Sequence, residues 1–257
     1  MTSISDETIS DTTDVGNALA SLFEEPPPPP QTIRGFGKAL QFHYGEPDLA
    51  GGQGEIIWES ADILLSILSV LYKNEYWKNK SVLELGSGVG RLGLFFAAVG
   101  SNVILTDQPV IVNAPFLQQN VCINNLQDQA TIRELDWTKT TSGIYQDWIQ
   151  PVDVVVASDC FFFSFLTKDF IQSLLAVSDE HTEIWLCNNG RWNKQDFFDK
   201  LSEYFIWYFV NPMDPSGKAL PNSWETIGTE GRVVKCRRRI PQKVDMGDER
   251  LQVEKEN

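Results

Sequence analysis

The pattern of apolar and polar positions changes along the chain, and from residue 81 onward it alternates between strand-like and helix-like spacing. Short apolar runs predict strands near 81–86, 102–106, 129–135, 152–158, 182–188, 204–210 and 231–237. Apolar residues three and four positions apart predict helices near 60–72, 90–99, 110–124, 165–177 and 193–202. Such alternation is typical of a parallel sheet that is covered by helices on both faces.

The last two predicted strands depart from this alternation, because no helical pattern separates them. They are therefore expected to pair as an antiparallel hairpin. The expected fold is α/β: a Rossmann-like, doubly wound, mostly parallel seven-stranded sheet with an antiparallel last strand.

Composition divides the chain into a central domain and two tails. Residues 1–32 are acidic and end in a run of prolines, so they predict a disordered tail. Residues 33–240 contain the alternating pattern, preceded by a strand-like stretch over 33–44 and the helix at 60–72. Residues 241–257 are charged and predict a second disordered tail.

The charge balance narrows the choice of partners. The net charge is −14 and the pI is near 4.5, which disfavours nucleic acid as a partner because phosphates demand a basic surface. The four cysteines are scattered and the two histidines lie far apart, so we expect free thiols, a reducing compartment and no metal site. We expect a monomer in the cytoplasm, with the nucleus as a second compartment, and no membrane span.

The most informative segment is the glycine-rich turn after the first strand of the alternating region. Glu84 ends that strand, and Gly86, Gly88 and Gly90 follow at alternating positions before a helix. Glycine lets a turn be tight and lets a ligand lie against the backbone, while the helix presents free N–H groups to that ligand. Asp107 ends the next strand, where a nucleotide site places its ribose-binding carboxylate.

The same turn indicates which nucleotide is bound. A dinucleotide site usually has the spacing G-x-G-x-x-G, but Arg91 stands where the third glycine would fall. Glu84 would repel a diphosphate and suits a cationic amino-acid end. S-adenosylmethionine has such an end, a ribose diol, an adenine and no phosphate, so it is the predicted cofactor.

Two further strand ends supply candidate site residues. Asp136 is predicted to accept a hydrogen bond from the adenine amino group, and Trp137 either stacks on the purine or packs in the core. Ala157 and Ser158 end the fourth strand and are assigned to the cofactor. The aromatic run that follows is expected to supply both packing and site residues.

These strand ends together resemble the seven-strand class I methyltransferases, and more narrowly the family-16 protein lysine methyltransferases. The matching motifs are Trp58, residues 84–90, residues 106–107, Asn120 with Asn124 and Asn125, residues 135–137 and residues 159–162. The resemblance covers roughly residues 33–240. It implies that Trp58 contacts the cofactor and that Asp159 and Phe162 act at the acceptor site. Phe162 stands where the family usually has tyrosine, so the ring is kept and the hydroxyl is lost.

The expected activity is methylation of a lysine side chain on a partner protein. A histidine acceptor also fits, because histidine is largely neutral at pH 7. A small-molecule methyltransferase and a noncatalytic cofactor-binding module remain as alternatives. Enzymes that methylate nucleic-acid bases typically carry prolines after the fourth strand, and residues 159–162 have none.

Overall fold

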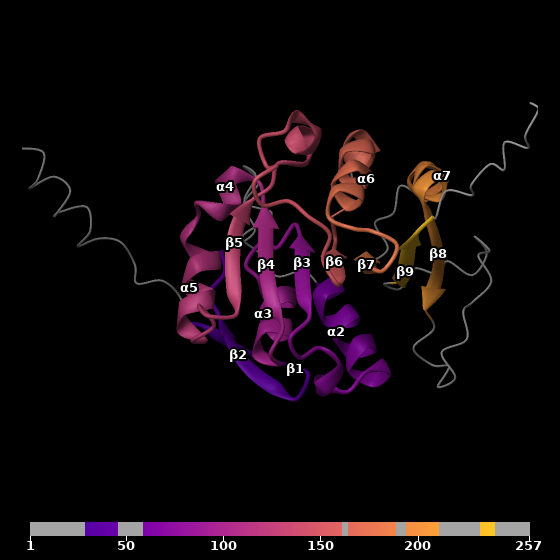
Figure 1. Cartoon of the computed structure of the whole chain (residues 1–257). Helices are drawn as coiled ribbons and strands as arrows, with labels where there is room; N and C mark the ends of the chain where they lie inside the picture. The colour runs from indigo at the N-terminus through magenta and orange to yellow at the C-terminus, as the bar shows by residue number, and fades with distance from the viewer. Residues whose placement is uncertain (1–28, 46–58, 161–163, 189–193, 211–231, 240–257) are drawn as a thin grey trace, which may run out of the picture. The chain divides into compact units, whose positions relative to one another are not determined.

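The structure is a computed structural model that describes residues 29–45, 59–160, 164–188, 194–210 and 232–239 (Figure 1). The chain divides into two compact units at Pro30, and the second unit, from Gln31 onward, holds the described secondary structure. Most of the predicted N-terminal tail and the whole predicted C-terminal tail lie outside the described residues, so both tails stay predictions.

A seven-stranded sheet forms the centre of the second unit (Figure 1). Its strands are β3 (Ser81–Leu85), β4 (Asn102–Asp107), β5 (Ala130–Glu134), β6 (Val154–Ser158), β7 (Glu183–Asn188), β8 (Phe205–Val210) and β9 (Arg232–Arg238). Their order is β5-β4-β3-β6-β7-β9-β8. The first five are mutually parallel, and β9 runs antiparallel to both β7 and β8. The predicted fold is confirmed.

The strand order identifies where a ligand should bind. From β3 the chain moves through β4 to β5 on one side, and β6 and β7 then extend the sheet on the other side. The direction therefore reverses between β3 and β6, and open α/β sheets bind ligands at the carboxyl ends of strands at such a point.

Helices cover both faces of the sheet. They are α2 (Glu59–Leu71), α3 (Arg91–Ala98), α4 (Pro109–Val112), α5 (Pro115–Ile123), α6 (Thr167–Ala176) and α7 (Lys194–Tyr204), with the 3-10 helices η2 (Asn74–Tyr76), η3 (Trp137–Ser142) and η4 (Ser164–Leu166). The single helix predicted over 110–124 is wrong. Ala114 is extended (φ −70°, ψ 150°) because it precedes Pro115, so the segment forms two helices.

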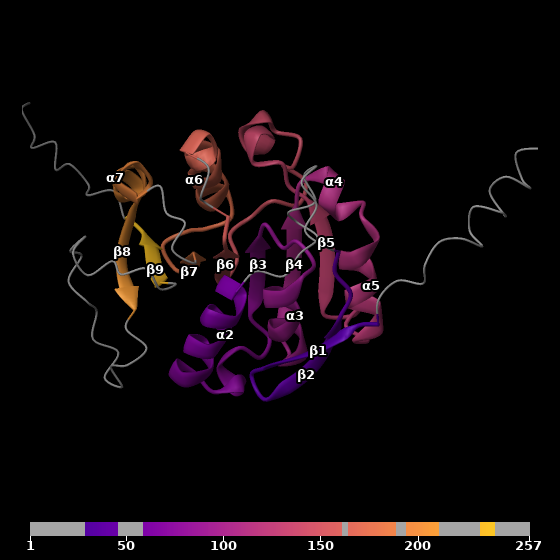
Figure 2. The same ribbon diagram turned by 180° about the vertical axis from the view of Figure 1, so that it is seen from behind.

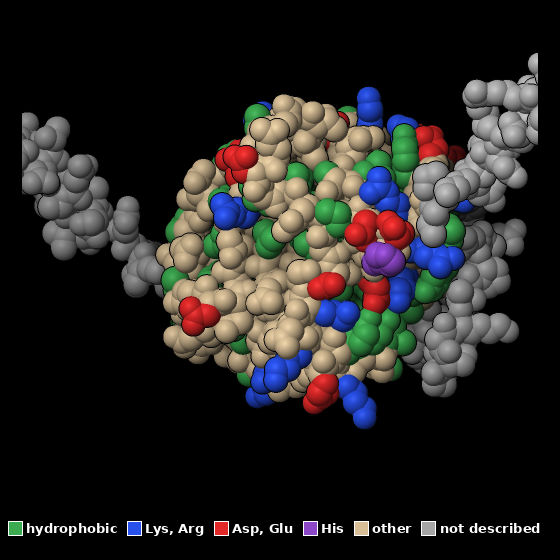
Figure 3. Space-filling model, viewed as in Figure 1, with side chains coloured by type: hydrophobic (Ala, Val, Ile, Leu, Met, Phe, Trp, Pro, Cys, Tyr) green, Lys and Arg blue, Asp and Glu red, His purple; other side chains and the backbone are tan. Residues whose placement is uncertain are grey.

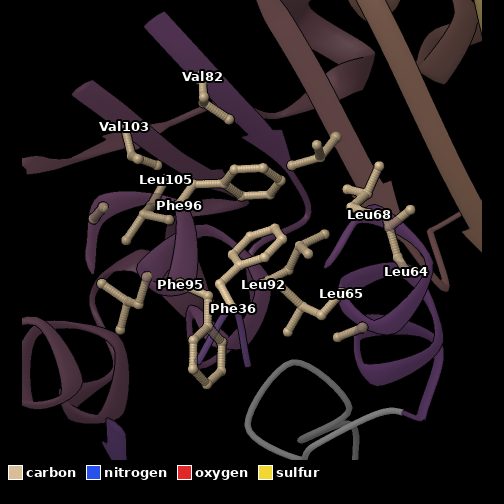
Figure 4. Packing of buried hydrophobic residues seen from close by; sticks show 14 of the residues in the cluster. Phe36, Leu64, Leu65, Leu68, Val82, Leu92, Phe95, Phe96, Val103 and Leu105 are labelled. Carbon is tan, nitrogen blue, oxygen red and sulfur yellow. The ribbon is translucent and has the colours of Figure 1, made fainter. Parts of the chain in front are cut away.

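Successive residues of each strand face opposite sides of the sheet and enter two separate hydrophobic clusters. Val82 of β3 belongs to the cluster with α2, α3 and α5, whereas Leu83 belongs to the cluster with α6 and α7. Figure 4 shows Phe95 and Phe96 of α3 inside the first cluster. Both rings are fully buried, so α3 is fixed against the strands that carry the glycine turn.

The strand-like stretch predicted over 33–44 folds as an antiparallel hairpin of β1 (Gln31–Gly35) and β2 (Lys38–Phe42). Phe36 and Gly37 form its turn with φ of 48° and 71°, the left-handed geometry that two-residue hairpin turns require. The Phe36 ring packs edge-on against Phe96, with 5.3 Å between centroids. Figure 2 shows the hairpin crossing below α3 toward α5.

Candidate functional site

The glycine turn lies at the carboxyl end of β3, beside the reversal in strand order. Gly86, Gly88 and Gly90 all have positive φ, of 71°, 52° and 83°. A Cβ on Gly86 would lie 2.5 Å from the Cys160 sulfur, and one on Gly90 would lie 2.8 Å from Leu117 Cδ1. The turn therefore needs glycine for its backbone geometry at all three positions, and for lack of space at Gly86 and Gly90.

Hydrogen bonds hold this turn in one conformation. Ser87 N donates to Thr106 O at 2.9 Å, and Gly90 N donates to Ser87 O at 2.7 Å. Gly88 N donates to Asp107 Oδ2 at 2.8 Å. The turn is thus bound to the end of β4 by both backbone and side chain.

The Glu84 side chain binds the first turn of helix α3. Its side chain is 1% exposed, and Oε2 accepts a hydrogen bond from Gly93 N at 2.9 Å. Gly90 is the N-cap of α3 and has no side chain that could cap the helix, so a carboxylate from β3 takes that role. Burial raises the Glu84 pKa to about 8. Its predicted contact with the amino-acid end of the cofactor stays a prediction.

Gly93 is a residue that the sequence interpretation missed. A Cβ there would lie 2.3 Å from Leu105 Cδ2 and 2.6 Å from Glu84 Oε2. Gly93 therefore lets α3 approach the sheet and lets Glu84 reach its first turn. The sequence contains a signal for Gly93. Gly88, Gly90 and Gly93 have the G-x-G-x-x-G spacing when the count starts at Gly88 instead of Gly86.

Asp107 lies at the end of β4 with its carboxylate against the turn. Oδ2 accepts from Gly88 N and Oδ1 accepts from Gln108 N, both at 2.8 Å. Burial raises its pKa to about 6. A carboxylate offers about four acceptor positions, so about two remain, enough for the two hydroxyls of a ribose.

Asp136 and Trp137 lie at the start of η3. Asp136 caps it through Oδ1, which accepts from Thr138 N at 3.0 Å, and Oδ2 pairs with Lys139 Nζ at 2.9 Å. A Cβ on Gly86 would lie 3.4 Å from Trp137 Cζ2, so the indole is next to the turn. Its Nε1 is buried and has no hydrogen-bond partner within the described part of the chain. Asp136 therefore has a structural role, and its predicted contact with adenine stays a prediction.

The end of β6 completes the site. Ala157 is fully buried in the strand and Ser158 ends it. Asp159 follows in the left-handed region (φ 54°), 5% exposed, and its N donates to Cys187 O at 2.9 Å. The Cys160 thiol, which sequence reasoning did not single out, donates to Leu85 O at 3.0 Å. This contact brings the end of β6 against the glycine turn.

The structure thus brings together most of the predicted residues at one end of the sheet. They are Glu84, Gly86, Gly88, Gly90, Asp107, Asp136, Trp137, Ala157, Ser158 and Asp159. Trp58 and Phe162 lie outside the described residues, and their roles stay predictions.

S-adenosylmethionine fits this set of residues. Asp107 keeps acceptors for the ribose, and Trp137 offers an aromatic ring and an indole N–H that has no partner among the described residues. The nearest cation in the sequence, Arg91, is engaged with Asp62 of α2, with Nε 2.8 Å from Oδ1. It is therefore not free to neutralise a diphosphate, which agrees with a cofactor that has no phosphate.

The described residues hold no group of three or more His, Cys, Asp or Glu side chains placed to bind a metal ion. Within the same ranges, no helix is both long and apolar enough to cross a bilayer. On the face drawn in Figure 3, Lys and Arg side chains are interspersed with Asp and Glu, so that face has no continuous basic surface.

Comparisons with known proteins agree with this geometry. The chain is 27% identical over 159 residues to the protein N-lysine methyltransferase METTL21A of Xenopus tropicalis, covering 60% of this chain and 69% of the relative. It is 31% identical over 123 residues to the calmodulin-lysine N-methyltransferase of Arabidopsis thaliana, covering 46% of this chain and 38% of the relative.

A solved structure supports the fold. The 16S rRNA N2 G1207 methyltransferase of T. thermophilus, in complex with AdoMet and guanosine, superposes with a TM-score of 0.55 at 18% identity. The match covers 82% of this chain and half of the other.

The sequence profile of the lysine methyltransferase family matches residues 40–204. The chain therefore belongs to the lysine methyltransferase family, whose cofactor is S-adenosylmethionine.

Proposed function

We propose that this protein transfers a methyl group from S-adenosylmethionine to a lysine side chain of a partner protein. The observation that carries the proposal is the position of Asp159, a buried acidic residue at the end of β6 whose neighbour Cys160 contacts the glycine turn. The family match and the names of the relatives support the same acceptor.

The residues already described would hold the cofactor. Asp107 would accept from the ribose hydroxyls, Trp137 would stack on the adenine, and the turn around Gly88 would receive the amino-acid end. When bound, the cofactor supplies an electrophilic methyl group on a sulfonium. The protein aligns the acceptor with that methyl group and excludes water.

A lysine acceptor must lose a proton before it can attack. With an unperturbed pKa of about 10.4, holding the amine neutral at pH 7 costs about 4–5 kcal/mol. An apolar wall lowers that pKa by desolvation, and Phe162 is the residue that we assign to it. The carboxylate of Asp159 would favour the charged ammonium. We therefore assign Asp159 to orientation of the acceptor and not to proton removal.

The test is label transfer from S-adenosylmethionine into a lysate of cells that lack the enzyme, followed by mass spectrometry of the labelled protein. We expect a methylated lysine with the wild-type protein. Asp159→Asn is the matched variant, because asparagine tolerates the left-handed backbone and removes only the charge. It should lower turnover strongly while cofactor affinity, measured by calorimetry, is preserved.

Three results would contradict the proposal or its assignment of Asp159. Label found only in a metabolite would establish a small-molecule acceptor, and label on histidine would replace lysine as the target. Full activity of Asp159→Asn on the true substrate would make Asp159 a structural residue.

A further inference from the structure

One asparagine of α5 joins three separate parts of the molecule. Asn120 is fully buried, and its Nδ2 donates to His43 O at 2.8 Å and to Val89 O at 2.9 Å. Its Oδ1 accepts from His43 N at 2.7 Å. Both donor positions of the amide are therefore used, one on the chain after β2 and one on the glycine turn.

Asn124 repeats half of this arrangement one helical turn later. Its Oδ1 accepts from Gln41 N at 2.8 Å, and its Nδ2 donates to Gln41 O at 2.7 Å and to Asn120 O at 2.8 Å. Residues four apart share a helix face, so the two amides meet Gln41 and His43, which are two apart. The pair of asparagines thus acts as a partner strand for the outer edge of the hairpin.

Of these two asparagines, Asn120 also makes a hydrogen bond to the glycine turn. Val89 lies between Gly88 and Gly90, both at positive φ. A peptide unit is planar, so a bond to the Val89 carbonyl fixes the orientation of the whole unit that ends at Gly90 N. Glycines have no side chain to restrict the backbone on either side, so this bond removes freedom that the turn would otherwise keep.

We propose that Asn120 is a positioning residue for the cofactor: it holds the Val89 carbonyl and so keeps the glycine turn in its binding conformation. It also couples that turn to the β1–β2 hairpin, because the same amide nitrogen bonds His43. This inference deepens the cofactor assignment above and rests on it.

The test compares Asn120→Ala with Asn124→Ala, which removes hairpin contacts of the same kind but no contact to the turn. Amide hydrogen exchange is measured on the full chain without cofactor. We expect Asn120→Ala to speed exchange over residues 86–91 and over 41–43, and Asn124→Ala to speed exchange in the hairpin alone. Asn120→Ser, which keeps a hydroxyl at the site, is the second variant if the alanine variant does not fold.

Calorimetry with S-adenosylhomocysteine provides the second readout. We expect the Asn120 variant to bind about tenfold more weakly, or about 1.4 kcal/mol, and Asn124→Ala to bind like the wild type. Unchanged exchange over 86–91 in the Asn120 variant, or equal loss of affinity in both variants, would overturn the proposal. Absence of binding to the wild type would overturn the cofactor assignment itself, whereas normal affinity of both variants would overturn only the role of Asn120.

Discussion

Two carboxylates beside the glycine turn have raised pKa values because their removal from solvent disfavours the charged forms. Glu84 is raised from 4.5 to about 8 and Asp107 from 3.8 to about 6. Each accepts backbone hydrogen bonds that partly offset the burial. The two side chains therefore make both stability and cofactor binding depend on pH.

Glu84 should make the protein less stable as the pH rises from about 4.5 to about 8. Across that window the folded protein holds a proton that the unfolded chain has lost, so the free energy of unfolding falls. Glu84→Gln should flatten this fall, a difference on the order of a few kcal/mol over the window. Urea unfolding at several pH values measures it. The control is Glu203→Gln, on an exposed position of α7, which should leave the pH dependence of the free energy of unfolding parallel to that of the wild type. The same parallel pH dependence for Glu84→Gln would contradict this role of Glu84.

Asp107 should make cofactor binding tighter as it ionises. Its pKa near 6 implies weaker binding at pH 5 than at pH 7, because a charged carboxylate accepts ribose hydroxyls more strongly. Asp107→Asn should lose about tenfold or more in affinity and should lose this pH dependence, since such bonds contribute about 1.5–3 kcal/mol each. Calorimetric titration at both pH values checks it. A pH-dependent affinity in Asp107→Asn equal to that of the wild type would remove Asp107 from the ribose site.

Residues just past apolar strands could be predicted, because topology alone places them at one edge of the sheet. This applies to Gly86, Asp107 and Trp137. The cap that Glu84 provides for Gly93 could not be predicted, since it depends on how closely α3 approaches β3. The contact of Cys160 with Leu85 joins residues 75 positions apart, so no local sequence pattern predicts it.

The position of α3 depends on the absence of a side chain at Gly93. Helix propensity alone favours Gly93→Ala by up to about 1 kcal/mol. The added Cβ would meet Leu105 and Glu84 at 2.3 and 2.6 Å, and overpacking of this kind typically costs about 1–3 kcal/mol. We therefore expect the cost of overpacking to exceed the gain in helix propensity.

Gly93→Ala should therefore unfold at a lower temperature and bind S-adenosylmethionine more weakly, because α3 must move away from the turn. Thermal unfolding and calorimetry on the same sample measure the two effects. A variant that is more stable than the wild type would show that the helix can shift without cost.

Element boundaries were predictable where local chemistry sets them and not where tertiary contacts do. Pro115 divides a helix that periodicity alone would make continuous. The bonds from Asn120 and Asn124 to the hairpin join residues 77 and 83 positions apart, so only the folded chain shows that these side chains close the edge of β2.

For the whole molecule, the α/β alternation was predictable because strands buried on both faces have continuous apolar runs. The insertion of β9 between β7 and β8 was not, because it depends on long-range pairing. The absence of a nucleic-acid partner, the monomeric state and the cytoplasmic location stay predictions.

The N-terminal unit should be dispensable for cofactor binding. The first 30 residues hold six Asp and Glu and no Lys or Arg, and all the predicted site residues belong to the unit that begins at Gln31. A chain that begins at Gln31 should bind S-adenosylmethionine as the full chain does, as measured by calorimetry. Weaker binding by the shortened chain would show that the acidic segment contributes to the site.

The most direct test of the proposed cofactor site is binding of S-adenosylmethionine to Gly88→Arg, measured by calorimetry beside Gly37→Arg. Both glycines have positive φ, so both variants carry similar backbone strain. A Cβ at Gly37 meets nothing within 4 Å, and that residue lies in the hairpin turn. We expect Gly88→Arg to lose binding and Gly37→Arg to bind like the wild type. Normal binding by Gly88→Arg would place the cofactor away from the glycine turn and contradict the proposed site.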